Sequence, residues 1–274
     1  MAPRQDPVVW SEGPTAGGPL SPAEVEHYRD QGFVVKRGLI GEGEVERLVT
    51  EIGLLAVAAD RSLDEVVTEP DSVVVRSIFR IDQKSEILAH LLLDPRLRGV
   101  ATQLLGDDVY LHQSRVNFKP AFSGQAFPWH SDFETWHIED GMPRMRALSA
   151  SILLTTNTEH NGPLLVVPGS HRLYVRCVGE TPPEHFRQSL KKQAYGVPDP
   201  GALTELVRVG GIASVTGPPG TVVFFDCNLM HGSTGNITPL PRHNIFAVYN
   251  SVNNRLVAPF GGTPARPDFL AARA

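Results

Sequence analysis

Two residues near the middle of the chain have the types and the spacing of metal ligands. His130 and Asp132 are separated by one residue, and in an extended segment the side chains at i and i+2 lie on the same face. His231, after the apolar stretch 221–226, could supply a third ligand if a distant strand returned beside the first. Two histidines and one carboxylate on one face of an iron ion leave positions open for substrate and O2. The same ligands could also bind zinc, so the pattern predicts a metal site without choosing the metal.

A pair of the form His-x-Asp is a weak signal in a chain with ten histidines, and a nearby arginine strengthens it. Arg242 stands eleven residues after His231, and Asn244 and Phe246 would share its face of a strand. A guanidinium can hold a carboxylate through two parallel N–H bonds, which lysine cannot reproduce. Arg242 is therefore a candidate anchor for the far carboxylate of 2-oxoglutarate. The alternative is a solvated surface arginine.

The overall composition favours a small-molecule partner. The chain has 274 residues and a formal net charge of −5 with 25 lysines and arginines, so no basic excess indicates a nucleic-acid or membrane partner. Its two cysteines are too few for a disulfide framework and lack the spacing of metal ligands. The N-terminus lacks the pattern of a signal peptide, and no apolar stretch reaches the ~18 residues that would span a membrane. We expect a soluble, cytoplasmic protein.

The first third of the chain has helical patterns. Residues 1–20, which are rich in Pro, Gly and Ser, are expected to form a flexible arm, and residues 21–274 a single domain. Ser21, Pro22 and Glu24 predict a capped helix over 22–31 that ends at Gly32. A strand is expected at 33–36, an amphipathic helix at 41–58 and a further helical stretch over 85–105.

From residue 108 the side chains alternate with a period of two. The row expected to face a ligand consists of Gln113, Arg115 and Asn117, and the opposite row of Tyr110, His112 and Phe118. Further strands are expected at 147–155, 163–168, 221–226 and 244–251, between Gly, Pro and Asn turns. This spacing is typical of a mainly β protein with flanking helices, the double-stranded β-helix or cupin-like jelly roll. Residues 173–219 contain several prolines and no strong period, so we expect an excursion that acts as a lid.

The order of these motifs resembles that of the phytanoyl-CoA hydroxylase family of jelly-roll dioxygenases. It runs from His130-Ser-Asp132 through Gly162-Pro-Leu and Pro168-Gly-Ser-His171 to His231 and Arg242. More narrowly, residues 127–147, FPWHSDFETWHIEDGMPRMRA, are similar nearly residue for residue to the signature of the ectoine hydroxylases in that family. Segments 189–193, 195–199 and 244–252 extend the resemblance over most of residues 21–260.

The resemblance implies a role for each residue that matches a motif. The implied Fe(II) ligands, which are also the catalytic residues, are His130, Asp132 and His231. The implied contacts to 2-oxoglutarate are Asn117, Ser233 and Arg242, and those to the substrate are Gln113, Trp136, Ser151, Phe225, Asn244 and Phe246. One of three further residues could orient a ligating histidine, and these are His137, Glu139 and Asp140. The histidines expected to be structural or on the surface are His112, His160, His171, His185 and His243.

The implied reaction is the Fe(II)- and 2-oxoglutarate-dependent hydroxylation of ectoine to 5-hydroxyectoine. It consumes O2, releases succinate and CO2, and yields a compatible solute that protects against osmotic stress. Ectoine is a small zwitterion with a delocalised cationic ring, which aromatic faces attract and which amide side chains can bind. The resemblance also allows a homodimer.

Other functions remain open at this point. A related dioxygenase could act on another small substrate, such as a free amino acid, with the same metal ligands. A non-catalytic jelly-roll binding protein is a further alternative, although it would have no need for Arg242. A halogenase of this fold is disfavoured, because Asp132 occupies the position that it would leave open for halide.

Overall fold

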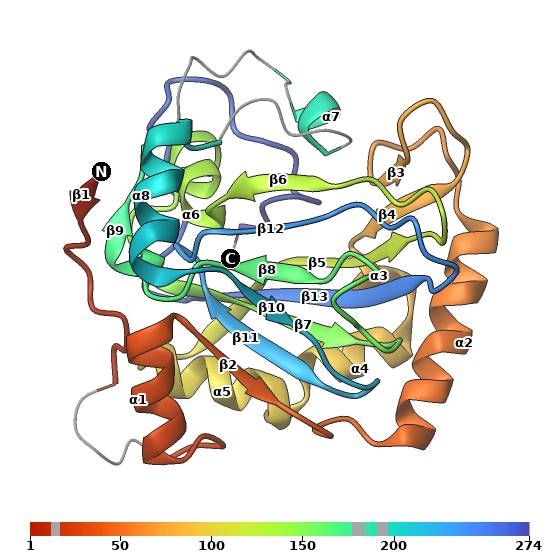
Figure 1. The fold of residues 1–274 in the computed structure, drawn as a ribbon, viewed down its shortest axis with the longest axis horizontal. Helices are drawn as coiled ribbons and strands as arrows, with labels where there is room; N and C mark the ends of the chain where they lie inside the picture. The colour runs from red at the N-terminus through yellow and green to blue at the C-terminus, as the bar shows by residue number, and fades with distance from the viewer. Residues whose placement is uncertain (12–16, 177–183, 185, 191–196, 274) are drawn as a thin grey trace.

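Antiparallel sheets flanked by helices make up the structure, a computed structural model that describes residues 1–11, 17–176, 184, 186–190 and 197–273 (Figure 1). This architecture confirms the predicted jelly roll with flanking helices. Within the described residues, no helix is both long enough and apolar enough to cross a membrane.

Two larger sheets organise the fold. One has seven strands in the order β2-β11-β7-β13-β5-β4-β3, the other has four in the order β10-β8-β12-β6, and β1 pairs with β9. The strands are β1 (Ala2–Pro3), β2 (Phe33–Lys36), β3 (Val66–Thr68), β4 (Val75–Phe79), β5 (Val109–Lys119), β6 (Phe127–His130), β7 (Ala147–Leu153), β8 (Leu164–Val166), β9 (Leu173–Tyr174), β10 (Ala213–Val215), β11 (Val222–Asp226), β12 (His231–Ser233) and β13 (Arg242–Ser251).

The helices lie before and between these strands. They are α1 (Pro22–Gln31), α2 (Glu42–Ala58), α3 (Ile81–Lys84), α4 (Glu86–Leu93), α5 (Pro95–Leu105), α6 (Asp132–Thr135), a π-helix (Trp136–Asp140), a 3-10 turn (Ser170–Arg172), α7 (Phe186–Ser189) and α8 (Pro200–Gly210). The predicted cap of α1 is present: Ser21 accepts from Glu24 N, Glu24 returns to the Ser21 backbone, and Gly32 ends the helix at φ 82°.

The two faces of the seven-stranded sheet bury different partners. On one face, Phe224 and Ile245 belong to the core cluster that includes the buried leucines of α4 and α5. On the other face, Phe225 and Phe246 pack with Val166 of the four-stranded sheet. Figure 1 shows α4 and α5 on one side of the larger sheet and the four-stranded sheet on the other. Successive residues alternate between these faces because side chains alternate across a strand, so the two sheets enclose an interior that can hold a site.

A β-bulge in β5 corrects one sequence prediction. Val248 is opposite Gln113, whereas Tyr249 is opposite Leu111, so His112 is an extra residue in the pairing. A bulge of this kind shifts the alternation by one residue. His112 therefore lies against Trp136 on the inner side, whereas Phe118, which was expected to share its face, packs on the helix-covered core.

The helical stretch expected over 85–105 is two helices rather than one. Asp94 ends α4 and caps α5, where it accepts a hydrogen bond from Arg96 N, and Pro95 stands at the first position of α5. A proline is favoured at this position because the first amide of a helix needs no acceptor within it.

The first ten residues make more contacts than a flexible arm would. Ala2 and Pro3 pair with β9, Arg4 N donates to Arg172 O at 2.9 Å, and Trp10 N donates to Leu104 O at 2.8 Å. These partners are distant in the sequence, so composition alone could not indicate them. The expectation of an arm is therefore corrected for residues 2–10, and residues 12–16 lie outside the described residues.

The lid expected over 173–219 falls partly on residues 177–183, 185 and 191–196, which lie outside the described residues, and it stays a prediction there. The end of the range is packed: Ala202 and Leu206 of α8 are buried with Val167 and Met230, and β10 pairs with β8. Residues 200–215 are therefore packed against the rest of the domain, and the role of the range as a lid stays a prediction.

Candidate metal centre and substrate cavity

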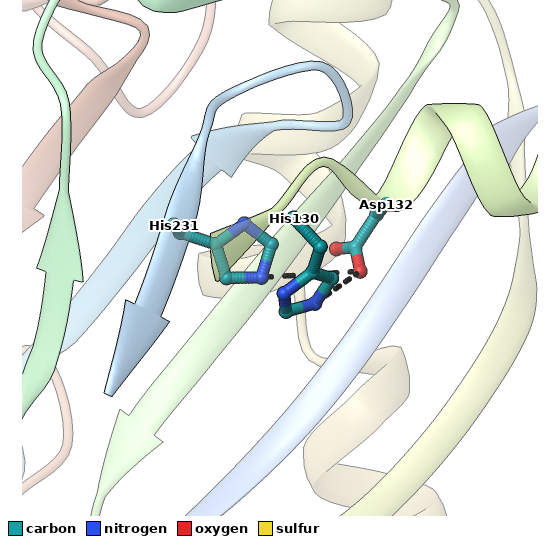
Figure 2. Close-up of side chains that lie close together, drawn as sticks. All are labelled: His130, Asp132 and His231. Atoms are coloured by element: carbon teal, nitrogen blue, oxygen red, sulfur yellow. Dashed lines mark ion pairs between the residues drawn. The ribbon is translucent and has the colours of Figure 1, made fainter. Parts of the chain in front are cut away.

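Two strands and one helix bring the three candidate metal ligands together. His130 ends β6, His231 begins β12, and the two are opposite each other in the antiparallel pairing. Asp132 begins α6, directly after β6. His130 Nε2 lies 3.7 Å and His231 Nε2 3.9 Å from Asp132 Oδ1 (Figure 2). One ligand atom of each residue lies within 4.8 Å of the others.

Backbone carbonyls set the orientation of both imidazole rings. His130 Nδ1 lies 2.8 Å from Pro128 O, and His231 Nδ1 lies 2.9 Å from Leu229 O. Because a carbonyl only accepts, each Nδ1 carries the proton and each Nε2 keeps its lone pair for a metal. Burial, followed by the neighbouring His231, lowers the pKa of His130 to about 3. His130 is therefore neutral at physiological pH, as metal binding requires.

Local structure also orients the Asp132 carboxylate. Ser131 caps α6 by accepting a hydrogen bond from Glu134 N, so the chain turns from strand to helix between the two ligands. Ser149 Oγ donates to Asp132 Oδ2 at 3.3 Å, while Oδ1 faces the imidazoles. Two imidazoles and one carboxylate, all buried, fit Fe(II) in a site with open positions. Zinc fits the same donors.

The candidate ligands belong to the wall of a cavity that residues from both sheets line. The other residues singled out from the sequence that line it are Gln113, Asn117, Trp136, Ser233, Arg242 and Phe246. The polar row of β5 was expected to face a ligand, and its three members, Gln113, Arg115 and Asn117, all line the cavity.

One part of this cavity is strongly cationic. Arg242 and Lys119 are opposite each other on β13 and β5, and Lys119 Nζ donates to Ser233 Oγ at 2.9 Å. Arg76 of β4 also lines the cavity and pairs with Glu69 at 2.9 Å. Buried Arg242 Nε has no hydrogen-bond partner among the described residues. Grouped cations with an unused donor are suited to binding an anion.

Burial and the grouping of like charges lower the pKa of two of these residues. Burial, together with the charge of Arg76, lowers the pKa of Arg242 to about 10. Burial, with the charges of Arg242 and Arg76, lowers the pKa of Lys119 to about 6. Arg242 therefore stays charged at neutral pH, whereas Lys119 is mostly neutral until an anion binds.

Another part of the cavity combines aromatic rings with two arginines. The guanidinium of Arg115 lies 4.9 Å from the ring centroid of Phe246 and donates to Gln113 Oε1. Arg266 donates to both carboxylate oxygens of Asp140, at 2.7 and 2.6 Å. Burial is the largest single influence on the pKa of Arg266 and lowers it, but the charges of Asp140, Glu139 and Asp132 and the hydrogen bond to Asp140 together raise the pKa. This region can therefore offer positive charge and aromatic surface to a small ligand.

Three of the residues expected to touch the substrate contact other residues of the site. Ser151, Phe225 and Asn244 are buried, and Ser151 is opposite Phe246 in the pairing of β7 with β13. Phe225 packs its ring against His231, with centroids 5.1 Å apart. The amide of Asn244 is satisfied when its oxygen accepts from Arg242 Nη1 at 3.2 Å. Phe225 therefore supports His231 and Asn244 supports Arg242, and direct contact of Ser151, Phe225 and Asn244 with the substrate stays a prediction.

The residues considered for orienting a ligating histidine have other partners. Asp140 pairs with Arg266, and His137 Nδ1 lies 2.8 Å from Met142 O. His112 lies 3.8 Å from Asp140 at the bulge of β5 and is fully buried. The Nδ1 positions of both candidate ligands are taken by carbonyls, which therefore do the orienting.

Sequence reasoning missed several cavity residues, of which Lys119, Arg76 and Arg266 are the most polar. Lys119 could have been found, because it continues the row of Gln113 and Asn117 at the same spacing. Arg76 lies on a strand that was not predicted, and Arg266 lies in an irregular segment without a periodic pattern.

Comparisons with known proteins agree with this site. Residues 28–244 match the family model of phytanoyl-CoA dioxygenase. The ectoine dioxygenase of Sphingopyxis alaskensis is 57% identical over 274 residues, which cover 100% of this chain and 89% of the relative. The ectoine dioxygenase of Bordetella bronchiseptica is 54% identical over 98% of this chain and 88% of the relative.

A solved structure extends the similarity to the fold. The crystal structure of EctD from S. alaskensis with 2-oxoglutarate and 5-hydroxyectoine matches with a TM-score of 0.90 and 51% identity. The match covers 100% of this chain and 91% of the other. The same fold is therefore found in a protein that binds a 2-oxo acid and a hydroxylated ectoine.

We predict that Asp132→Ala abolishes Fe(II) binding, because two imidazoles alone leave the ion without its anionic ligand. Anaerobic titration with Fe(II) measures the affinity. Asp108→Ala, which removes an exposed carboxylate just before β5, is the control and should bind Fe(II) as the wild type does. Unchanged Fe(II) affinity of Asp132→Ala would contradict the assignment.

Proposed function

Because the chain belongs to the phytanoyl-CoA dioxygenase family, and within it to the ectoine dioxygenases, we propose that it hydroxylates ectoine to 5-hydroxyectoine with Fe(II), 2-oxoglutarate and O2. Succinate and CO2 are the other products. The observation that carries this proposal is the presence in one cavity wall of a buried two-histidine, one-carboxylate cluster and of Arg242.

The metal centre is formed by His130, Asp132 and His231. Bound Fe(II) supplies the redox chemistry that activates O2, at the expense of the oxidative decarboxylation of 2-oxoglutarate. The chain contributes two imidazoles whose rings are oriented by backbone carbonyls and one carboxylate oxygen. Burial of all three residues limits access of water to the reacting atoms, which protects reactive species from side reactions.

The cationic part of the cavity binds the far carboxylate of 2-oxoglutarate. Arg242 presents an unpaired Nε–H, and Lys119 and Ser233 are already joined by a hydrogen bond. Asn117 lies on the same row of β5 and accepts a hydrogen bond from Ser77 at 2.8 Å. These groups orient the cosubstrate so that its 2-oxo end faces the metal ligands.

The aromatic part of the cavity binds ectoine. Trp136 offers a ring to the delocalised cation, and Arg115 offers positive charge to the carboxylate. Gln113 is fixed by donating to Leu270 O at 2.7 Å and accepting from Arg115. The Phe246 ring is covered by Arg115, so we assign Trp136, rather than Phe246, to the cationic ring.

Two expectations from the sequence stay predictions. They are the cytoplasmic location and the homodimer that the family resemblance allows.

Turnover with candidate substrates tests the proposed function. Purified protein with Fe(II), 2-oxoglutarate and O2 should convert ectoine to a product heavier by one oxygen atom, with one succinate formed per product. Mass spectrometry and succinate quantification measure both. Free proline serves as the comparison substrate, and faster turnover of proline than of ectoine would contradict the assigned substrate.

Arg242→Lys should lower the affinity for 2-oxoglutarate much more than the affinity for ectoine. Lysine keeps the charge but loses the two parallel N–H bonds to a carboxylate. Apparent affinities from steady-state kinetics measure the two effects. Arg208→Lys changes an exposed arginine on α8 and should alter neither affinity. Equal weakening of both ligands in Arg242→Lys would argue against a carboxylate anchor.

The affinity for 2-oxoglutarate should fall as the pH rises above about 6, where Lys119 is mostly neutral in the free protein. A bound carboxylate raises the pKa of Lys119, so the complex holds more protons than the free protein and a rise in pH opposes binding. The dissociation constant should therefore increase by up to about tenfold per pH unit, the limit for one linked proton.

Anaerobic titrations of 2-oxoglutarate from pH 6 to 8.5 measure this dependence. Lys119→Met should bind 2-oxoglutarate more weakly at pH 6, and its affinity should no longer depend on pH. Lys36→Met, outside the cavity, should keep the pH dependence of the wild type. A pH dependence that persists in Lys119→Met would exclude this lysine as its origin.

A further inference from the structure

The N-terminal segment is attached to the structure next to the metal centre. After β1 pairs with β9, the Asp6 carboxylate accepts from Met145 N at 2.8 Å and from Arg144 Nε at 2.7 Å. Between these contacts, the Arg4 side chain enters the interior, where only 3% of it is exposed. An arginine is rarely buried unless it is paired, so its partners indicate what it does.

The partner of Arg4 is Asp226, the last residue of β11. Arg4 Nη1 donates to Asp226 Oδ1 at 2.8 Å, and 2% of the aspartate side chain is exposed. Arg4 Nη2 donates to Met145 O at 2.9 Å. Among the described residues, Arg4 is the only basic side chain that forms an ion pair with Asp226.

Asp226 begins the corner, residues 226–230, that leads directly to His231. Asn228 N donates to the same Asp226 Oδ1 at 2.8 Å, and Leu229 N donates to Asp226 O at 3.0 Å. Leu229 O in turn holds His231 Nδ1 at 2.9 Å. A short series of hydrogen bonds therefore joins Arg4 to the carbonyl that orients one imidazole.

The same corner contacts the segment that carries the other two ligands. Phe133 N donates to Cys227 O at 2.8 Å, directly after Asp132. Ser131 Oγ donates to Asn228 Oδ1 at 3.4 Å, between His130 and Asp132. A displacement of the corner would therefore be transmitted to both sides of the metal centre.

We propose that Arg4 is a positioning residue for the metal centre, and that it acts by neutralising Asp226 and thereby holding corner 226–230 in place. Without Arg4, Asp226 would be a buried carboxylate lacking its cation. Breaking a buried pair in this way is costly, and the corner would move to give the carboxylate access to water. The inference rests on the proposed metal centre and adds the N-terminal segment to it.

The affinity for a metal ion shows whether Arg4 positions the metal centre or only attaches the N-terminal segment to the rest of the structure. Co(II), whose absorption reports the coordination of the ion, is titrated under argon into wild type, Arg4→Met, Asp226→Asn and the double variant R4M/D226N. Arg144→Met is the matched control, because Arg144 is the partner of Asp6 and so contacts the same N-terminal segment as the partner of Arg4 does. The thermal midpoint of each metal-free protein is measured in parallel, and affinities are taken well below it.

We expect Arg4→Met to lower the affinity for Co(II) by about tenfold, the lower end of the effect of residues that orient metal ligands. The double variant should recover most of this loss, because asparagine keeps the acceptor for Asn228 N without a buried charge. Arg144→Met should bind Co(II) like the wild type. If Arg4→Met does not fold, Arg4→Gln replaces it, since it also removes the cation that pairs with Asp226.

A lower thermal midpoint with unchanged Co(II) affinity in Arg4→Met would overturn the proposal. Arg4 would then only attach the N-terminal segment. If the double variant bound Co(II) as weakly as Arg4→Met does, Arg4 would not act through Asp226. Failure of the metal centre itself is distinguishable, because wild type would then bind Co(II) no better than Asp132→Ala.

Discussion

The candidate site depends on one strand pairing, that of β6 with β12. The antiparallel register places His130 opposite His231, and a carbonyl two residues before each histidine turns its Nε2 inward. Because side chains alternate across a strand, a register shift of one residue would turn one imidazole away from the cluster. The larger sheet supplies the facing wall through the row of β5 and the first residues of β13. The core packed on its other face holds that wall in position.

Charge is the second constraint on the cavity. Arg242, Lys119 and Arg76 lie in one region with Glu69 as the paired carboxylate, and their mutual repulsion is part of what lowers the pKa of Lys119. Such a group is unfavourable in the free protein and becomes favourable when an anion binds. In the proposed function, a dicarboxylate cosubstrate would place one negative group among these cations and the other beside the metal. Arg266, by contrast, is paired with Asp140 and lies near Glu139, so its charge is compensated within the protein.

The sequence was informative where a pattern is local and less so where distant segments meet. The jelly roll, the cap of α1 and the polar row of β5 follow from short-range spacing, and the resemblance added the ligand and cosubstrate residues. The bulge at His112 and the burial of Asn244 beside Arg242 depend on partner strands, which no single segment specifies. The contacts of Arg4 join residues more than two hundred positions apart, so composition indicated a loose segment where the structure has a buried ion pair.

We propose that the metal ligands and the Arg242 region are two ends of a single cosubstrate site. An anaerobic crystal structure with Fe(II), 2-oxoglutarate and ectoine tests this claim most directly. We expect the 2-oxo end to bind the iron held by His130, Asp132 and His231 and the far carboxylate to contact Arg242 and Lys119, with ectoine beside Trp136. A far carboxylate bound to Arg266 or Arg115, with ectoine in the Arg242 region, would contradict it.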